Sequence, residues 1–140
     1  MIEKSPAKIW RLRDTLYRLR YGYCKKCGRS FYPPRARCVY CGSQDVEYRY
    51  SRGRGVLREY TVIYQVPKGL GDYSPLVIGL IELDEGFRVL AQLVDAEPSR
   101  LREGMRVEAV LRRLSVDGST GLIYYGLKFT PSLQQGEEVR

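Results

Sequence analysis

The sequence has 140 residues and is 44% hydrophobic, so it can form one compact core with a small accessory module but not two full-sized domains. Its formal net charge is +8, and no apolar run approaches the roughly 20 residues that a membrane-spanning helix requires. We therefore expect a soluble, cytoplasmic protein without a membrane or targeting segment.

The basic excess lies in the N-terminal part of the chain. Residues 1–58 contain 15 Lys or Arg and 4 acidic residues, a net charge of +11, whereas residues 59–140 contain 9 and 12, a net charge of −3. This distribution indicates that the N-terminal part faces an anionic partner, which is a nucleic acid, a phosphorylated ligand or an acidic protein surface. The absence of asparagine favours a thermophilic source.

An amphipathic helix is predicted at the N-terminus. Ser5 and Pro6 suit the N-cap and the first helical position, and the apolar residues that follow recur at helical spacing as far as Leu19. The helix is expected to end near Gly22, so residues 1–22 are assigned to a helical arm. Its apolar stripe is expected to pack on its own domain, with docking on another protein or a phosphate as the alternative.

All four cysteines lie in residues 23–52, in the pattern C-x2-C-x10-C-x2-C. Cys24 and Cys27 form one pair and Cys38 and Cys41 the other, and each pair is followed by a glycine that permits a tight turn. Four thiolates complete the tetrahedral coordination of zinc and leave no position for substrate. We therefore predict a rubredoxin-like ribbon around a structural zinc ion, with an iron–sulfur or redox site as the alternative.

No catalytic residues are predicted. The sequence contains no histidine, the commonest general base, and the predicted metal site uses every cysteine thiol. It also lacks the P-loop, the glycine-rich dinucleotide-binding motif and the nucleophile elbow. Carboxylates at predicted strand ends, such as Asp84, Glu85 and Asp95, are interpreted as solvated turn charges. We therefore expect a protein without enzymatic activity of its own.

Five strands are predicted after the turn sequence SRGRG. They span residues 56–66, 76–84, 87–95, 107–114 and 122–129, and a further strand is predicted in the cysteine-containing segment at 46–50. Residues 96–104 are expected to form a short helical turn between the third and fourth of the five strands. Three strands, a helical segment and two strands follow the order of a five-stranded OB-fold barrel. We assign the barrel to residues 53–131 and a flexible tail to residues 132–140, so the fold class is mainly β.

Segments from both parts of the chain resemble the DUF35 family of zinc-ribbon and OB-fold proteins associated with acyl-CoA. The resemblance is carried, in order and spacing, by CKKCGRSFYPPRARCVYCGS, SRGRGVLREYTVIYQVP, PLVIGLIELDEGFRVLAQLVD and LREGMRVEAVLRRL. It extends from about Trp10 to Pro131 and implies a helical arm, a zinc ribbon and an OB barrel. The metal ligands of the family carry over as Cys24, Cys27, Cys38 and Cys41.

The resemblance also implies a function. Archaeal members of the family are expected to be non-catalytic subunits that bridge acetoacetyl-CoA thiolase and hydroxymethylglutaryl-CoA synthase of the mevalonate pathway. We accordingly expect a scaffold that binds a coenzyme A thioester and has thiolase-type enzymes as partners. Arg35 and Arg37, beside two prolines, are the candidates for contacting the phosphates, since guanidinium groups bind phosphate bidentately. The alternative is that they offset the thiolate charge or stay solvated.

A single-stranded nucleic-acid-binding protein is the main alternative, because a zinc ribbon, an OB barrel and a basic half also suit that function. Bases would then stack on the barrel tyrosines Tyr60, Tyr64, Tyr124 and Tyr125. The barrel segment is acidic or neutral overall, however, whereas a groove that follows a phosphate backbone is expected to be basic. The sequence therefore favours the scaffold over a nucleic-acid partner. A regulator that binds acyl-CoA without an enzyme is a third possibility.

Overall fold

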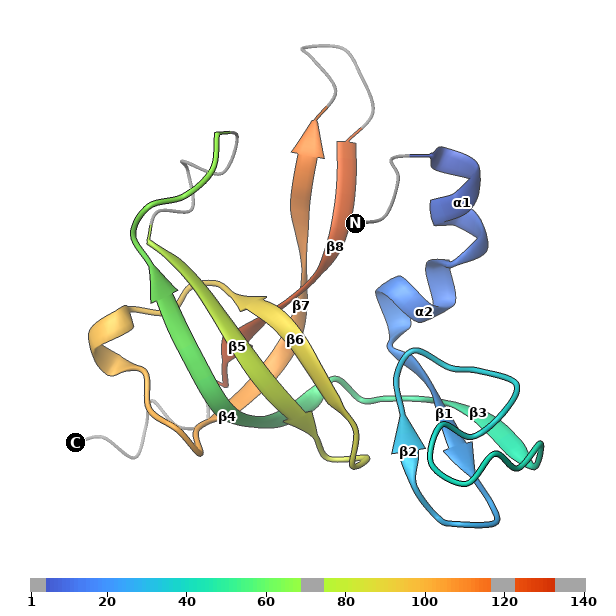
Figure 1. Ribbon diagram of the computed structural model, residues 1–140. Coiled ribbons are helices and arrows are strands. Elements are labelled where there is room, and N and C mark those ends of the chain that lie inside the picture. The colour runs from blue at the N-terminus through green and yellow to red at the C-terminus, as the bar shows by residue number, and fades with distance from the viewer. Residues whose placement is uncertain (1–4, 69–74, 117–122, 133–140) are drawn as a thin grey trace.

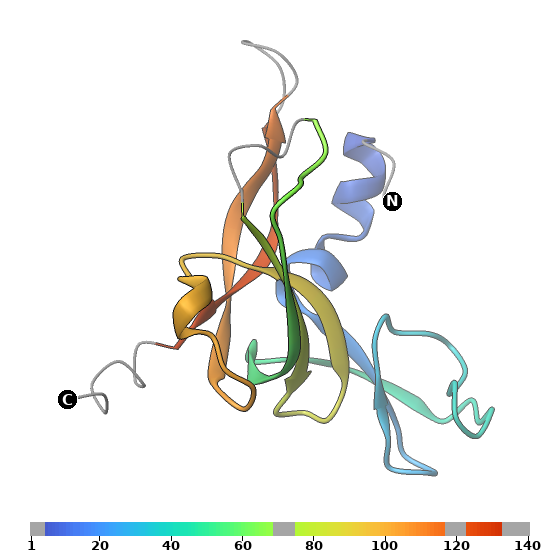
Figure 2. The ribbon, with the colours of Figure 1, turned by 60° about the vertical axis from the view of Figure 1, so that its left-hand side comes forward.

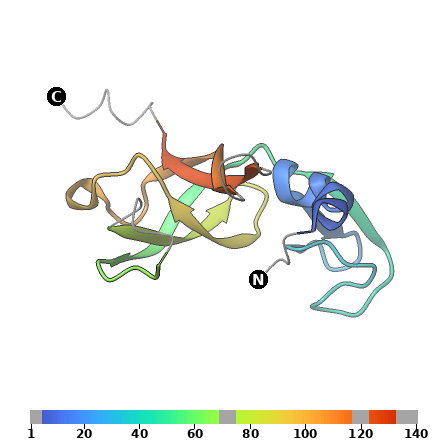
Figure 3. The ribbon, with the colours of Figure 1, turned by 90° about the horizontal axis from the view of Figure 1, so that it is seen from above.

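The computed structural model describes residues 5–68, 75–116 and 123–132, and within these ranges the side chains of residues 114–116, 123 and 124 are not described. A helical arm and a three-stranded sheet lie beside a closed five-stranded barrel (Figure 1). Seen from above, the arm and the small sheet lie together at one end of the barrel (Figure 3). The mainly β fold class is therefore confirmed. The predicted tail, apart from its first residue, lies outside the described residues.

The N-terminal arm contains two short helices, α1 (Pro6–Arg11) and α2 (Arg13–Arg18). They are separated at Leu12, and neither buries a residue. The chain leaves α2 at Leu19, which has a left-handed φ of 49°, and enters a strand at Arg20. The prediction of one helix ending near Gly22 is therefore wrong, because pairing within a sheet replaces the last helical turn. Within the described residues, no helix has the length and apolar character needed to cross a membrane.

The small sheet is formed by β1 (Arg20–Cys24), β2 (Ser30–Phe31) and β3 (Val46–Tyr50). The central strand is β1, which pairs antiparallel with both neighbours. A Cβ at Gly22 would lie 2.6 Å from the buried ring of Phe31, so the close approach of β1 and β2 requires glycine. The sequence predicted β3 but missed β1, which was assigned partly to the helix, and the two-residue β2.

The barrel contains β4 (Arg54–Ile63), β5 (Leu76–Leu83), β6 (Arg88–Leu93), β7 (Arg106–Val116) and β8 (Ile123–Pro131). It closes in the order β4-β5-β6-β8-β7, through antiparallel pairing of β4 with β7 and a parallel contact between Leu93 and Phe129. The 3₁₀ helix η2 (Pro98–Arg100) lies between β6 and β7, away from the small sheet (Figures 1 and 3). The strand order confirms the predicted OB fold.

One hydrophobic core fills the barrel. Buried and half-buried residues alternate along β5, as expected for a strand with one face inside. The largest fully buried side chains of the barrel are Leu57, Ile81, Leu83, Val107 and Phe129. Removing these apolar surfaces from water is the main contribution to the stability of the barrel.

Phe87 joins the small sheet to the barrel. It follows the turn between β5 and β6, is 2% exposed, and stacks on Tyr21 and Tyr32 with ring-centroid distances of 4.8 and 5.7 Å. The Tyr32 hydroxyl also donates a hydrogen bond of 3.0 Å to the carbonyl oxygen of Thr15 in α2. Leu19 and Tyr21 consequently belong to the same buried cluster as the barrel core. The side view shows the barrel turn reaching toward the small sheet (Figure 2).

Glu85 fixes the segment that connects the two parts. Its carboxylate accepts hydrogen bonds from the Ser51 hydroxyl at 2.7 Å and from the backbone N–H of Arg52 at 2.9 Å. The backbone N–H of Ser51 donates to the carbonyl oxygen of Leu19 at 3.1 Å. Glu85 is therefore half-buried and bound to this segment rather than a solvated turn charge. The SRGRG turn is held against the barrel.

Replacing Phe87 with alanine should destabilise both parts of the protein. The substitution removes a buried ring that contacts Tyr21 and Tyr32, and such changes cost about 3–5 kcal/mol of unfolding free energy. Urea unfolding followed by circular dichroism measures the loss. The control is Leu90→Ala on the adjacent strand, where the side chain is 74% exposed and the expected change is below about 0.5 kcal/mol. Equally small effects of both substitutions would contradict the role given to Phe87.

Candidate metal centre and ribbon–barrel pocket

The four cysteines converge on one point. Their Sγ atoms all lie within 4.8 Å of one another, with 3.6 Å between the sulfurs of Cys24 and Cys41 and between those of Cys27 and Cys38. These distances far exceed a disulfide bond of about 2.05 Å. Tetrahedral zinc with Zn–S bonds of about 2.3 Å places its sulfur ligands about 3.8 Å apart. The donor set and its spacing therefore fit one zinc ion held by these four residues.

The same turn shapes each cysteine pair. The backbone N–H of Gly28 donates to the carbonyl oxygen of Cys24 at 2.8 Å, and that of Gly42 donates to the carbonyl oxygen of Cys38 at 3.0 Å. Both glycines adopt the positive φ that the turn needs, 73° and 74°. Two short sequence motifs thus present their sulfurs in the same way, as the sequence predicts.

Backbone N–H groups stabilise the thiolate form of the two buried cysteines. The hydrogen bond from the N–H of Cys27 lowers the pKa of Cys24. Burial raises the pKa of Cys38, but hydrogen bonds from the N–H groups of Cys41 and Tyr40, together with those from the thiols of Cys27 and Cys41, outweigh it, and the pKa falls to about 6. Thiolate is the form that binds zinc. The turns therefore prepare these sulfurs for metal binding.

The ribbon has little apolar core apart from its metal ligands. Its buried cluster consists of Cys24, Phe31 and Cys38, with Val46 packed against it. So few apolar residues do not stabilise a segment of this length unaided. Zinc bound to the four thiolates would supply a structural cross-link, and its filled coordination would leave no position for a substrate.

Loss of zinc should unfold the ribbon. Purified protein is expected to contain about one zinc ion per chain, and Cys38→Ser should lose most of it because the remaining three thiolates leave the tetrahedron incomplete. Elemental analysis measures the metal, and circular dichroism measures the fold. Lys26→Ser, at an exposed position between two ligands, is the control and should retain its zinc. A fully folded, metal-free Cys38→Ser protein would refute the structural role.

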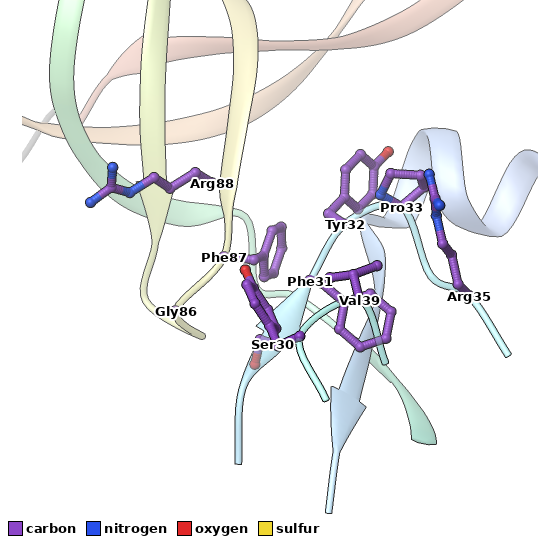
Figure 4. Close-up of a pocket in the computed structure, with 10 residues that line it drawn as sticks. Ser30, Phe31, Tyr32, Pro33, Arg35, Val39, Gly86, Phe87 and Arg88 are labelled. Atoms are coloured by element: carbon purple, nitrogen blue, oxygen red, sulfur yellow. The ribbon is translucent and has the colours of Figure 1, made fainter. Parts of the chain in front are cut away.

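A pocket of about 330 Å³ lies between the cysteine loops and the barrel. This ribbon–barrel pocket is lined by Ser30, Phe31, Tyr32, Pro33, Arg35, Val39, Tyr40, Gly86, Phe87 and Arg88. Phe87 and Tyr32 face each other there, and Arg35 and Arg88 lie on opposite sides of the aromatic residues (Figure 4). The pocket combines cationic groups with aromatic walls, which suits a ligand that carries both a phosphate and an aromatic ring.

The two arginines predicted to bind a ligand lie in different surroundings. Both are exposed, but Arg35 lines the ribbon–barrel pocket whereas Arg37 does not belong to its lining. Arg88, on the barrel side of the lining, was not predicted from the sequence; its side chain points away from the aromatic residues (Figure 4), and its guanidinium lies 3.4 Å from Glu82. No local pattern could have identified it, because its place depends on the contact between the barrel turn and the ribbon.

Acidic groups of the barrel bind arginines of the barrel. Asp84 accepts two hydrogen bonds of 2.8 Å from Arg106, which hold the pKa of its carboxyl below the usual value. Asp95 accepts a hydrogen bond of 2.7 Å from Arg112. Both carboxylates are exposed at strand ends, as expected, but each is also paired. These pairs reduce the number of barrel cations that are available to an external anion.

The barrel tyrosines considered for base stacking differ in exposure. Tyr60 is half-buried against the core and donates a hydrogen bond of 3.1 Å to the carbonyl oxygen of Leu101. Tyr64 and Tyr125 are 71% and 47% exposed. The side chain of Tyr124 lies outside the described residues. Tyr60 is therefore unsuited to base stacking.

Two domain families match the chain. Residues 15–47 match the family described as "ChsH2, rubredoxin-like zinc ribbon domain", and residues 48–112 match "ChsH2, C-terminal OB-fold domain". Together they include the four cysteines and the barrel strands as far as Arg112 in β7. The predictions of a zinc ribbon and of an OB fold are thus confirmed.

Similarity to known proteins extends over most of the chain. It is 38% identical over 128 residues to a "DUF35 domain-containing scaffold protein" of Pyrococcus furiosus, covering 91% of this chain and 93% of that protein. It is 42% identical over 67 residues to a "3-oxo-4,17-pregnadiene-20-carboxyl-CoA hydratase alpha subunit" of Mycobacterium tuberculosis, covering 48% of this chain and 21% of that subunit. A chain of the solved "Ltp2-ChsH2(DUF35) aldolase" matches with a TM-score of 0.65 and 28% identity, over 93% and 96% of the two chains.

Proposed function

The chain belongs to the DUF35 family, and we propose that it is a non-catalytic scaffold subunit that binds an enzyme of acyl-CoA metabolism. The observation that carries the proposal is similarity to a scaffold protein across both modules, over 91% of this chain. The contact of Phe87 with Tyr21 and Tyr32 supports it, since a scaffold must hold its binding surfaces in a fixed relation. Relatives named as a hydratase subunit and an aldolase support an acyl-CoA enzyme as the partner.

The closed coordination of the metal supports a structural role for it. With four protein thiolates around zinc, no coordination position remains to polarise a thioester or to activate water. The contribution of this chain would then be shape and binding surface, and turnover would belong to its partner.

We propose acetoacetyl-CoA thiolase and hydroxymethylglutaryl-CoA synthase of the mevalonate pathway as the partners. Family resemblance is the basis for this choice. A scaffold that binds both enzymes would hold their active sites close together, so that acetoacetyl-CoA passes from one to the other before it diffuses away.

We further propose that the ribbon–barrel pocket binds part of the coenzyme A thioester. Arg35 and Arg88 would contact phosphate oxygens, and the aromatic walls would contact the adenine. Arg37, on the same loop as Arg35, is proposed as a second phosphate contact outside the pocket. The volume of about 330 Å³ is at the low end for ligand pockets. The rest of the ligand would therefore contact the partner enzyme.

Co-expression with the thiolase and the synthase of the same source should give a stable complex. Size-exclusion chromatography and native mass spectrometry of the untagged proteins would detect it and give its stoichiometry. The isolated chain should show no thioester conversion, since turnover is assigned to the enzymes. Binding of single-stranded oligonucleotide at physiological salt, together with no binding of either enzyme, would favour the nucleic-acid alternative and overturn the scaffold proposal.

Arg35→Ala should weaken binding of acetoacetyl-CoA by about 10- to 100-fold, the equivalent of one charge-assisted hydrogen bond of about 1.5–3 kcal/mol. Calorimetric titration of the assembled complex measures this affinity. Arg37→Ala should have a smaller effect because Arg37 lies outside the pocket. Arg102→Ala, an exposed residue near η2, is the control and should leave the affinity unchanged. Equal affinities of the Arg35 and Arg102 variants would exclude the pocket as the binding site.

A further inference from the structure

Two arginines and two tyrosines form a cluster on the small sheet and the end of α2, in which Arg20 is half-buried and the other three residues are exposed. The guanidinium of Arg18 lies 4.1 Å from the ring centroid of Tyr50, and that of Arg20 lies 4.3 Å from the ring centroid of Tyr48. The tyrosines are two residues apart on β3, so they share one face of the strand, and they are 43% and 44% exposed. We call these four residues the arginine–tyrosine face.

The cations of this face have no acidic partner within the described part of the chain. Ion pairs there involve five barrel arginines but neither Arg18 nor Arg20. The paired arginine of the small sheet is Arg49, which binds Glu47 on the opposite face of β3. Stacking on an aromatic ring leaves the N–H groups of a guanidinium available to an anion. The arginine–tyrosine face is therefore prepared to bind external negative charge.

The composition of the arginine–tyrosine face favours a protein as its negatively charged partner. Tyrosine and arginine are the residues enriched at the centres of protein interfaces, where a few of them supply most of the binding energy. None of the four residues lines the ribbon–barrel pocket, so the face is separate from the site proposed for coenzyme A. It also lies beside an edge strand, because β3 is the last strand of its sheet. A partner can thus approach this side without displacing another strand.

The charge of the neighbouring barrel disfavours a nucleic acid. A single strand adds one negative charge per nucleotide, and its path beyond the face would meet the barrel, residues 53–131, which contains 10 basic and 10 acidic residues and so offers no net positive charge. Phe87 holds this neutral barrel next to the small sheet. A protein surface can instead place two carboxylates opposite the face and present neutral or basic groups to the barrel.

We propose that the arginine–tyrosine face docks on an acidic patch of the partner enzyme, with Arg18 and Arg20 each bound to a carboxylate. This inference rests on the proposed scaffold function and names the chemistry of one of its contacts. Alternate residues of a strand such as Tyr48 and Tyr50 lie about 6.6 Å apart. The two carboxylates are expected at a similar separation, as on alternate residues of a strand or on successive turns of a helix.

The test uses the full-length double variant Arg18→Glu/Arg20→Glu with the purified thiolase and synthase. Affinity for the enzyme that binds this face should fall at least about 100-fold, because reversed charges replace two attractions with repulsions. The control is Arg100→Glu/Arg102→Glu, which makes the same charge change at exposed positions near η2, on the side of the barrel away from the small sheet (Figure 3). This variant should bind within about twofold of the wild type.

A second variant gives a result that does not depend on how well the first one folds. Arg18→Lys/Arg20→Lys keeps both charges and introduces amines that a carbodiimide couples to nearby carboxylates. Mass spectrometry of the cross-linked complex should find residue 18 or 20 joined to an aspartate or glutamate of the partner. Cross-links elsewhere but at neither position would overturn the proposal.

The remaining outcomes separate this proposal from the one it rests on. If the wild type binds neither enzyme, the scaffold function fails and the docking contact fails with it. If the wild type binds, but Arg18→Glu/Arg20→Glu and Arg100→Glu/Arg102→Glu have the same affinity as each other, the proposed docking contact is wrong. The scaffold function stands in that case. If the Arg18 and Arg20 changes abolish binding of an oligonucleotide and leave enzyme binding intact, the face belongs to a nucleic-acid site.

Discussion

The convergence of four cysteine sulfurs on one point, suited to a single zinc ion, is the constraint on which the ribbon depends. Cys24 and Cys38 are at once predicted metal ligands and two of the three residues in its buried cluster, so a bound metal would replace the hydrophobic core that so short a segment cannot form. The loop that carries Arg35 runs between the two cysteine pairs. A metal bound to both pairs would therefore help to fix the position of this loop relative to the barrel.

The ring of Phe87 connects the ribbon to the barrel by stacking on Tyr21 and Tyr32. Tyr32 contacts Phe87 on one side and, through its hydroxyl, the carbonyl oxygen of Thr15 on the other. The metal-bound loops, the helical arm and the barrel turn thus meet around two aromatic rings. Binding sites at the ribbon–barrel pocket and at the arginine–tyrosine face would keep a fixed separation, which is what a protein needs if it orients other molecules without reacting with them.

Local patterns account for the features that the sequence predicted well. The two cysteine pairs and the alternating barrel strands depend on neighbours within a few residues, and both were predicted close to their observed positions. The end of the N-terminal helix was predicted wrongly. Its apolar repeat continues to Leu19, but pairing with β3, which is distant in the sequence, makes the chain a strand from Arg20. Glu85 was misread because its partner Ser51 lies 34 residues away, and Arg88 was missed because the ribbon residues that share its pocket are distant in the sequence.

The hydrogen bonds from Ser51 and Arg52 to Glu85 limit which insertions and deletions the connector can accept. A glycine-containing connector is ordinarily where a chain accepts extra length or a cut. Here a lengthened connector would pull two hydrogen-bond donors from their carboxylate, and a barrel expressed without its ribbon would leave the Phe87 ring open to water. We therefore expect the ribbon and the barrel to evolve together as one unit. New partners would be acquired by substitutions of surface residues rather than by rearrangement of the two modules.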